Sequence, residues 1–396
     1  MRAGRSRRRR GGVAARAAAA AVLLSALGPV GCGGGGAGSA PRASAEQTAA
    51  GGAGDGAGRA GGAGQDDPAR LTVRQAIGQR MVYAYSGARP PKALLTRIAR
   101  GEAAGVVLFS RNVRSVAAVR AQIAQLQKVE RPAAVDAPLL VMVDQEGGTV
   151  RRLPGPPAAG AGQTPDAAAA RANGRAAGRL LRAAGVTVDF APVVDVARPG
   201  AALEGEGRTY GRDPATVAQR AGAFAAGLRG AGVAPVLKHF PGFGAATINT
   251  DDGVARVDLP LATLRSVDGA PYRRLKPEAV MLSTAIYPRV DPRPAAFSRR
   301  WVTTELRGRL KFGGVTVSDD LQAPAVARYG SPSQLAFFAM RAGVDLPLFA
   351  QSYEAGARAA EGLVQAVKSG ALSRDELEAG ARRVLAWRLA IARRAG

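Results

Sequence analysis

The stretch GVTVSDD, from Gly314 to Asp320, carries the pattern from which the fold is predicted. It begins with a short run of β-branched residues, Val315 to Val317, and then turns acidic at Asp319 and Asp320. A largely apolar run without a polar face is typical of a strand that is buried on both faces, as in a parallel sheet. The stretch therefore predicts a buried strand that presents carboxylates at its carboxyl end.

Similar runs recur between residues 80 and 349, separated by stretches of helical period. They are RMVYAYSG, GVVLFS, LLVMVDQ, VTVDFAPVVDV, PVLKHF, EAVMLS and GVDLPLF. Helix start signals occur at Asp213-Pro214 and in the Ser373 to Glu376 capping box. Eight buried strands alternating with helices predict an α/β fold, a (β/α)8 TIM-like barrel forming a single catalytic domain over residues 69–396. An open doubly wound sheet is the alternative.

Polar residues lie at or near the carboxyl ends of these predicted strands. They are Asp144, Asp195, Lys238 with His239, Asp319 with Asp320, and Asp345. In a barrel the carboxyl ends of all strands meet at one face, where barrel enzymes keep their chemistry. We therefore expect these side chains to converge, although Asp320 and Asp345 are equally typical of helix caps.

The amino-terminal region reads as a sorting signal followed by a tether. Six arginines in the first ten residues precede the apolar run Val13 to Leu27, which is too short for a permanent membrane span. Small and apolar residues before Cys32 resemble a lipobox, which predicts a lipoprotein-type signal peptide over 1–31 and lipidation of Cys32. An ordinary signal peptide cut near GSA, or a twin-arginine route, is the alternative. The Gly- and Ala-rich segment 32–68 is expected to be a flexible tether.

Composition narrows the classes of partner. The formal charge is +25, and the seven arginines before Cys32 account for only part of it, so the remaining chain is basic. No basic cluster is interleaved with aromatic residues, so we expect no nucleic acid partner. One histidine and one cysteine supply no ligand cluster, so we expect no metal and no cofactor. We expect a monomer.

Five motifs in this order resemble glycoside hydrolase family 3, specifically its single-barrel β-N-acetylhexosaminidases that act on cell-wall fragments. They are VDQEGGTVRRL (143–153), VDFAPVVDV (188–196), RTYG (208–211), KHFPG (238–242) and VTVSDDL (315–321). The resemblance implies that Asp319 is the nucleophile of a retaining mechanism. It also implies that the N-acetylglucosamine ring is bound by Asp144, Arg152, Arg208, Lys238 and His239.

The loop KHFPGFGAATINTDDG, from Lys238 to Gly253, departs from the family pattern. The family's second motif histidine is replaced by Phe243, and its aspartate–histidine dyad by Asn249 and Asp251; a further family histidine appears as Thr284. A carboxyl group can replace an imidazole if burial and a neighbouring negative charge raise its pKa. We therefore expect Asp251, assisted by the adjacent Asp252, to be the acid/base, with a solvated turn as the alternative.

The resulting hypothesis is an exported glycosidase on the outer face of the cell membrane, lipid-anchored, that removes β-linked N-acetylglucosamine or a similar sugar during peptidoglycan turnover. Secretion without an anchor is the alternative location. Two other functions stay open: a sugar-binding lipoprotein on a catalytically degenerate barrel, and a scaffold that positions partners at the membrane. Transfer of the sugar to phosphate rather than water also stays open.

Overall fold

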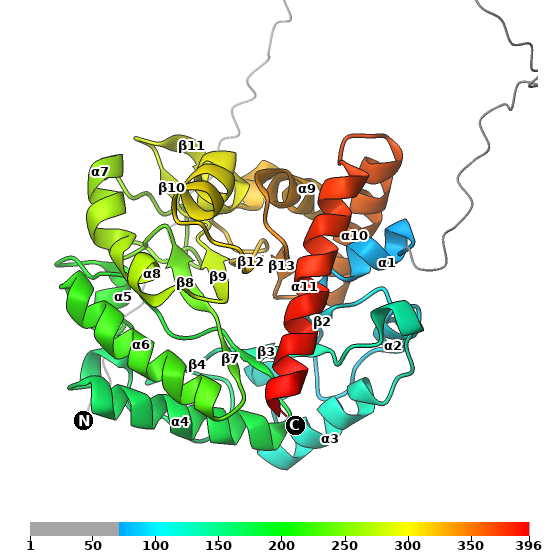
Figure 1. Cartoon of the computed structure of the whole chain (residues 1–396), viewed down its shortest axis with the longest axis horizontal. Coiled ribbons are helices and arrows are strands. Elements are labelled where there is room, and N and C mark those ends of the chain that lie inside the picture. Colours follow the sequence, from blue (N-terminus) through cyan, green and yellow to red (C-terminus); the bar gives the residue numbers. More distant parts are fainter. Residues whose placement is uncertain (1–70, 396) are drawn as a thin grey trace, which may run out of the picture. The chain divides into compact units, whose positions relative to one another are not determined.

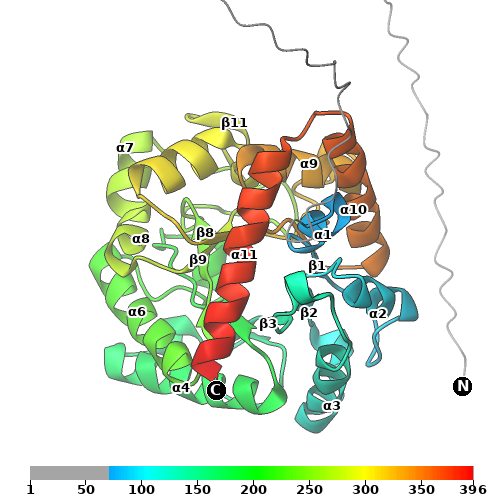
Figure 2. The same cartoon turned by 45° about the vertical axis from the view of Figure 1, so that its right-hand side comes forward.

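The computed structural model describes residues 71–395. The predicted signal peptide, Cys32 and the tether all lie outside this range. In the described part, helices surround a central set of strands (Figure 1). A view from a second direction shows the last helix, in red, running past the strands (Figure 2). None of the helices between residues 71 and 395 is both long and apolar enough to cross a membrane.

The central strands pair in parallel and form two sheets. The first has six strands in the order β13-β1-β2-β3-β6-β7, and the second has three in the order β12-β9-β8. Their bounds are β1 Val82–Tyr83, β2 Gly105–Val107, β3 Leu140–Val143, β6 Val188–Asp189, β7 Ala234–Pro235, β8 Leu237–Phe240, β9 Ala279–Leu282, β12 Val315–Ser318 and β13 Leu348–Phe349. All the apolar runs singled out in the sequence contain a strand, and the α/β class with parallel strands is confirmed. Strand pairing gives two sheets, not the one closed sheet of the prediction.

Helices follow most of the central strands. Their bounds are α1 Val73–Gly78, α2 Lys92–Ala99, α3 Val116–Gln127, α4 Ala167–Ala184, α5 Ala202–Gly205, α6 Pro214–Gly230, α7 Leu261–Thr263, α8 Ala270–Leu275, α9 Pro332–Ala342, α10 Tyr353–Lys368 and α11 Arg374–Ala395. Both predicted helix starts are confirmed, because Asp213 accepts from the Thr216 N–H at 2.7 Å and Ser373 from the Glu376 N–H at 3.3 Å. Two antiparallel hairpins were not predicted: β4 (Gln145–Gly147) with β5 (Val150–Arg151), and β10 (Ile286–Tyr287) with β11 (Asp291–Pro294).

Apolar side chains fall into two buried clusters. Along β3, Leu140 and Met142 belong to one cluster and Val141 and Val143 to the other, as the alternation of side chains along a strand requires. The smaller cluster draws side chains from the strand segments of both parallel sheets, together with Val384, Trp387 and Ile391 of α11. The larger cluster fills the space between strands and helices.

One of the charged residues expected at the strand ends lies elsewhere. Asp345 precedes β13 and is fully buried. Its carboxylate pairs with Arg307 at 2.7 Å and Arg383 at 2.8 Å, and it accepts from the backbone N–H of Thr316 at 2.9 Å. Thr316 is near the start of β12, so the expectation that Asp345 lies at the carboxyl ends was wrong. Its role is to hold the opposite end of the strands together.

Candidate active site

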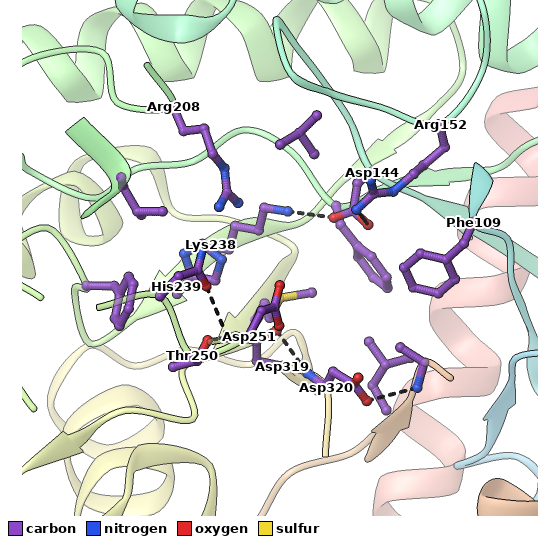
Figure 3. A pocket seen from close by; sticks show the side chains of 18 of the residues that line it. Phe109, Asp144, Arg152, Arg208, Lys238, His239, Thr250, Asp251, Asp319 and Asp320 are labelled. Atoms are coloured by element: carbon purple, nitrogen blue, oxygen red, sulfur yellow. Dashed lines mark hydrogen bonds and ion pairs between the residues drawn. The ribbon is translucent and has the colours of Figure 1, made fainter. Parts of the chain in front are cut away.

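A cavity of about 550 Å³ lies at the carboxyl ends of the parallel strands (Figure 3). This volume is within the range of pockets that bind small ligands, about 300–1,000 Å³. The cavity is lined by every site residue expected in the folded part: Asp144, Arg152, Arg208, Lys238, His239, Asp251 and Asp319. The strand order therefore brings together residues that are up to 175 positions apart in the chain.

Lys238 is the centre of a buried ion cluster. Its Nζ lies 2.7 Å from Oδ1 of Asp144 and 2.7 Å from Oε1 of Glu146. Arg152 reaches the other oxygen of Asp144 at 3.4 Å. Burial alone would raise the pKa of Asp144, but the ammonium of Lys238 and the guanidinium of Arg152 outweigh it, so this pKa lies below the usual value. Asp144 is therefore an ionised acceptor at the cavity wall.

Arg208 extends the cluster through a two-pronged pair with Glu146, with distances of 2.9 Å from Nε and 2.8 Å from Nη2. Its Nη1 lies 3.0 Å from Glu206, which in turn accepts from the Asn249 side chain at 2.9 Å. Burial of Glu146 would raise its pKa, but Arg208 and Lys238 together lower it far below the ordinary range. A bidentate pair of this kind fixes the plane of the guanidinium. Arg208 is thus held rigidly beside the loop that carries Asn249 and Asp251.

The hairpin β4–β5 positions the acidic half of the cluster. Gly147 and Gly148 have positive φ values of 106° and 58°, a conformation that favours glycine. A Cβ on Gly147 would lie 2.3 Å from the carbonyl oxygen of Ala159, so no larger residue fits there. The two glycines therefore allow a sharp turn after Asp144. It returns the chain so that Arg152 faces Asp144 across the hairpin.

His239 is fixed by a carboxylate behind the cavity. Its Nδ1 lies 2.8 Å from Oδ2 of Asp195, which is buried. Asp195 also accepts from the backbone N–H of His239, at 3.1 Å, and of Phe243, at 2.6 Å. The ring of Phe243 packs edge-on against the imidazole, with centroids 5.9 Å apart. The residue that replaces a family histidine therefore supports the remaining one by packing.

Asp319 follows β12 and is held from both sides. Its backbone N–H donates to the Leu282 carbonyl of β9 at 2.8 Å, and one carboxylate oxygen accepts from the Asp320 N–H at 2.9 Å. The hydroxyl of Thr250 lies 3.4 Å from the other oxygen. Asp320 plays a different part, because its carboxylate accepts from the backbone of Gln322 and Ala350, both at 2.9 Å. Asp320 therefore ties two loops together, and it caps neither α9 nor α10, which are capped by Ser331 and Ser352.

Asp251 lines the same cavity as Asp319 (Figure 3). The adjacent Asp252 is not among the lining residues. Asp251 is an exposed residue, but partial loss of solvent around its carboxyl group and the nearby charge of Asp319 raise its pKa, while Arg208 and His239 partly oppose the shift. Asn249 accepts from the Asp251 backbone N–H at 3.2 Å, and its amide nitrogen is directed to Glu206. Asn249 thus shapes the backbone of this turn; contact with the Asp251 carboxyl group is not among its interactions in the described residues.

Three residues near the site were not identified from the sequence. Glu146 bridges Lys238 and Arg208. Phe109 lies at the cavity wall below the guanidinium groups of Arg111 and Arg152, whose Cζ atoms are 4.8 Å and 5.4 Å from the ring centroid. Asp189, fully buried on β6, accepts from the Gln145 N–H at 2.8 Å, while its Oδ2 has no partner. Burial raises the pKa of Asp189 to about 8.

Comparison with known proteins gives consistent results. Residues 72–387 match the Glycosyl hydrolase family 3 N terminal domain. An uncharacterized secreted glycosyl hydrolase from Arthroderma benhamiae is 36% identical over 323 residues, which cover 78% of this chain and 91% of that protein. A beta-hexosaminidase from Xanthomonas oryzae is 38% identical over 300 residues, which cover 70% of this chain and 88% of that one.

Among solved structures, a glycoside hydrolase family 3 beta-N-acetylglucosaminidase from a Paenibacillus species superposes with a TM-score of 0.76 and 31% identity. The match covers 82% of this chain and 64% of the other, so this chain corresponds to about two thirds of that protein. The family domain matches well over half of the chain, and the matched residues include the motifs that line the cavity. This chain therefore belongs to glycosyl hydrolase family 3, and the expectation of a glycosidase is confirmed.

Proposed function

We propose that the protein is a retaining β-N-acetylhexosaminidase that acts on wall-derived glycans. The observation that carries this proposal is that Asp319 and Asp251 line one cavity with an ion cluster suited to sugar hydroxyls. The names of the Xanthomonas and Paenibacillus proteins support the choice of sugar. The composition of the chain, with its signal-like start, supports a substrate outside the cytoplasm.

Asp319 is the nucleophile in this proposal. Its carboxylate attacks the anomeric carbon, the bond to the leaving oxygen breaks, and a covalent glycosyl-enzyme forms. The hydrogen bonds from Thr250 and from the Asp320 backbone hold the attacking oxygens in one orientation. Fixed orientation lowers the barrier because little freedom remains to be lost in the transition state.

Asp251 is the acid and then the base. Before attack, the Asp319 charge raises the pKa of Asp251 and so favours the protonated form, which donates to the leaving oxygen. Once Asp319 is esterified, its negative charge is gone, and the pKa of Asp251 falls. Asp251 is then ready to accept a proton from the incoming water, which releases the sugar with retained configuration. Asp319 thus raises the pKa of Asp251 while it is ionised, and this effect ends when Asp319 is esterified, which is the step at which Asp251 must act as a base.

The ion cluster binds the sugar. Asp144 accepts from hydroxyl groups, and Lys238 and Arg208 donate to them, while His239 offers the nitrogen that Asp195 does not contact. Charged partners discriminate strongly between hydroxyl arrangements, because a mismatched sugar leaves them unpaired in a buried site. Arg152 lies between Asp144 and Phe109 and completes the ion cluster next to that aromatic ring.

We also infer that the two parallel sheets are parts of one eight-stranded barrel, in which β7 and β8, separated only by Val236, form a single barrel strand. Isolated bridges join Val193 to Lys238 and Val317 to Leu346, at the two places where the sheets adjoin. The smaller apolar cluster, which alternates with the larger one along the strands, suits a barrel interior. The side chains of α11 in that cluster would then close its amino end.

For location, we propose export and attachment to the outer face of the membrane through a lipid on Cys32. The apolar run, the small residues before Cys32 and the Gly-rich segment after it support this. The secreted relative from Arthroderma benhamiae supports export, with or without the lipid.

The nucleophile assignment is tested with 5-fluoro-N-acetylglucosaminyl fluoride, whose 5-fluorine slows the second step while the acetamido group is kept. Mass spectrometry of the intact protein should show one added sugar, and the labelled peptide should contain Asp319. Asp319→Asn should stay folded, remain unlabelled and lose turnover. A label on any other residue would overturn the assignment, and a parent that binds N-acetylglucosamine but hydrolyses no β-glycoside would favour a sugar-binding protein instead.

A further inference from the structure

The outer face of α4 carries a row of arginines. Arg171, Arg175 and Arg179 are exposed and follow one another at intervals of four residues. Side chains at this spacing are neighbours on one face of a helix, with about 5–6 Å between their Cβ atoms. The buried residues of α4, such as Ala177 and Leu181, face the core instead. The three guanidinium groups therefore form a line of positive charge on the outside of the molecule, where α4 lies in both views (Figures 1 and 2).

Within residues 71–395, no carboxylate lies at ion-pair distance from this row. α4 contains neither aspartate nor glutamate. Asp166, which precedes the helix, caps it by accepting from the Ala169 N–H at 2.8 Å. Arg182, in the last turn, has an interaction of its own, so the row of unpaired guanidinium groups ends at Arg179.

Several arginines on the other long helices, in contrast, are held by acidic partners. On α6, Arg229 pairs with Glu278 at 3.3 Å. On α11, Glu378 lies 2.6 Å from Arg374 and 3.6 Å from Arg382. Like charges four residues apart destabilise a helix, and α4 has two such pairs in succession. This arrangement favours a partner that supplies the negative charge from outside the described chain.

The surroundings of α4 indicate what kind of partner fits. The helices α3 and α6 both contact α4, and neither contains an aspartate or glutamate. A broad face with excess positive charge suits an extended anionic surface. The three helices hold a single aromatic residue, Phe224, which is buried, so the face offers no ring on which a nucleic acid base could stack.

We propose that this face of α4 docks on the surface of a membrane that contains anionic lipids. The choice of a membrane over a soluble polyanion rests on the location proposed above, with a lipid on Cys32. About 40 residues separate Cys32 from the described part of the chain, and such a segment spans at most about 140 Å, so α4 can reach the bilayer. A lipid and a basic face together bind a membrane more stably than either does alone.

This docking leaves the sugar cavity open. α4 follows the hairpin β4–β5, which positions the cavity residues, and it ends just before β6 begins. The helix therefore runs along the side of the strands, from their active-site end to the opposite end. With α4 against the membrane, the cavity opens parallel to the bilayer, where a glycan can enter it.

The test is co-sedimentation of the full chain with vesicles of phosphatidylcholine, with or without phosphatidylglycerol. All samples carry Cys32→Ser, so the result does not depend on whether Cys32 is lipidated. The chain should bind the anionic vesicles and should dissociate from them as the salt concentration rises. Replacement of Arg171, Arg175 and Arg179 together by glutamine should weaken this binding roughly tenfold to a hundredfold, because each arginine near an anionic surface adds to the attraction.

A matched control removes three other exposed arginines. Arg89, Arg100 and Arg358 flank α2 or lie on α10, and none has a carboxylate partner in the described residues. Their replacement by glutamine causes the same loss of charge and should leave vesicle binding like that of the parent. Both triple variants should hydrolyse a soluble aryl N-acetylglucosaminide like the parent, which shows that the fold is intact.

A fluorescent label identifies the face that touches the vesicle. Cys32→Ser leaves the chain without cysteine, so a fluorophore can be attached to Ala172→Cys on α4 or to Gln365→Cys on α10, both at exposed positions. Anionic vesicles should shield the label at 172, but not the label at 365, from a quencher dissolved in water. Equal shielding, or equal binding by the two triple variants, would contradict the proposal. Tighter binding of the α4 row to soluble polyphosphate than to vesicles would replace the membrane by a soluble polyanion.

Discussion

The imidazole Nδ1 of His239 lies 2.8 Å from Oδ2 of Asp195, a carboxylate that is almost completely buried. This contact places the proton on Nδ1 and leaves Nε2 as the free nitrogen of the ring. His239 is the only histidine of the chain, and its strand and its carboxylate partner both fix it in place. A ring held in this way suits the binding of a sugar hydroxyl more than proton transfer by a mobile loop.

Asp195→Asn should therefore weaken substrate binding through His239. Hydrogen bonds to charged groups contribute about 1.5–3 kcal/mol, so we expect KM to rise roughly tenfold to a hundredfold with a smaller change in kcat. Steady-state kinetics on an aryl N-acetylglucosaminide measures this. In a His239→Ala background the same substitution should add little, and independent, additive effects of the two changes on KM would contradict the coupling.

Asp189→Asn should flatten the dependence of stability on pH. Burial raises the pKa of Asp189 to about 8 in the folded state, against about 3.9 in an unfolded chain, so the folded state holds a proton that the unfolded state has lost between these values. Stability contributed by this group is therefore present at low pH and is lost as the pH rises to about 8, by about 1.4 kcal/mol per pH unit at most.

Urea unfolding of the parent and of Asp189→Asn at pH 5 and pH 8 measures this effect. The variant should lose less stability between the two pH values, because an amide keeps the acceptor for Gln145 and does not titrate. Asp252→Asn, at an exposed position, is the control and should follow the parent. If Asp189→Asn also loses as much stability as the parent over this range, Asp189 is ionised in the folded protein.

The strands could be predicted because they are continuous buried runs, and the pattern is local. Which strands pair with which could not be predicted, because pairing depends on segments that are far apart in the chain. Both hairpins were missed because their sequences read as turns: β4 ends in Gly147, and β11 contains two prolines, at positions 292 and 294. Asp345 was misplaced because the strand in GVDLPLF begins only after Pro347.

Most of the ion cluster at the cavity was predicted, but the charge balance of the predicted residues points to what was missing. The predicted cations were Lys238, Arg152 and Arg208, and Asp144 was their only predicted carboxylate partner. Three cations at one cavity, of which Lys238 is buried, need more than one acid, and this imbalance is the signal that could have identified Glu146. Adjacent turn residues carry no such signal, so the distinction between Asp251 and Asp252 required the structure.

Cys32→Ser should release the protein from membranes if Cys32 carries the lipid anchor. A diacyl anchor binds membranes stably, whereas the basic charge of the chain alone would be screened by salt. Fractionation of cells in high salt, followed by detection of the protein in the membrane and soluble fractions, measures this. The replacement of Ser39 by alanine, a few residues further on, is a control that should remain membrane-bound, and unchanged fractionation of Cys32→Ser would remove the anchor from the proposal.

Asp251→Asn should separate the two chemical steps. The substitution removes the acid/base but leaves the Asp319 nucleophile and the ion cluster in place, so loss of a positioned acid should slow hydrolysis of natural substrates by roughly 10²–10⁴-fold. Formation of the glycosyl-enzyme from a dinitrophenyl glycoside should change little, because that leaving group departs without protonation. The decline of the parent's kcat/KM at high pH, where Asp251 loses its proton, should be absent with this substrate.

Azide then tests the second half of the mechanism. Asp251→Asn should accumulate glycosyl-enzyme, and added azide, which needs no base, should restore turnover and give a glycosyl azide of retained configuration. Asp252→Asn is the matched control: it changes the adjacent carboxylate, which does not line the cavity, and should hydrolyse natural substrates like the parent without any effect of azide. If both variants behave like the parent, neither Asp251 nor Asp252 is the acid/base of the reaction. If phosphate in place of azide rescues Asp251→Asn equally well and also accelerates the parent, the sugar is transferred to phosphate rather than to water.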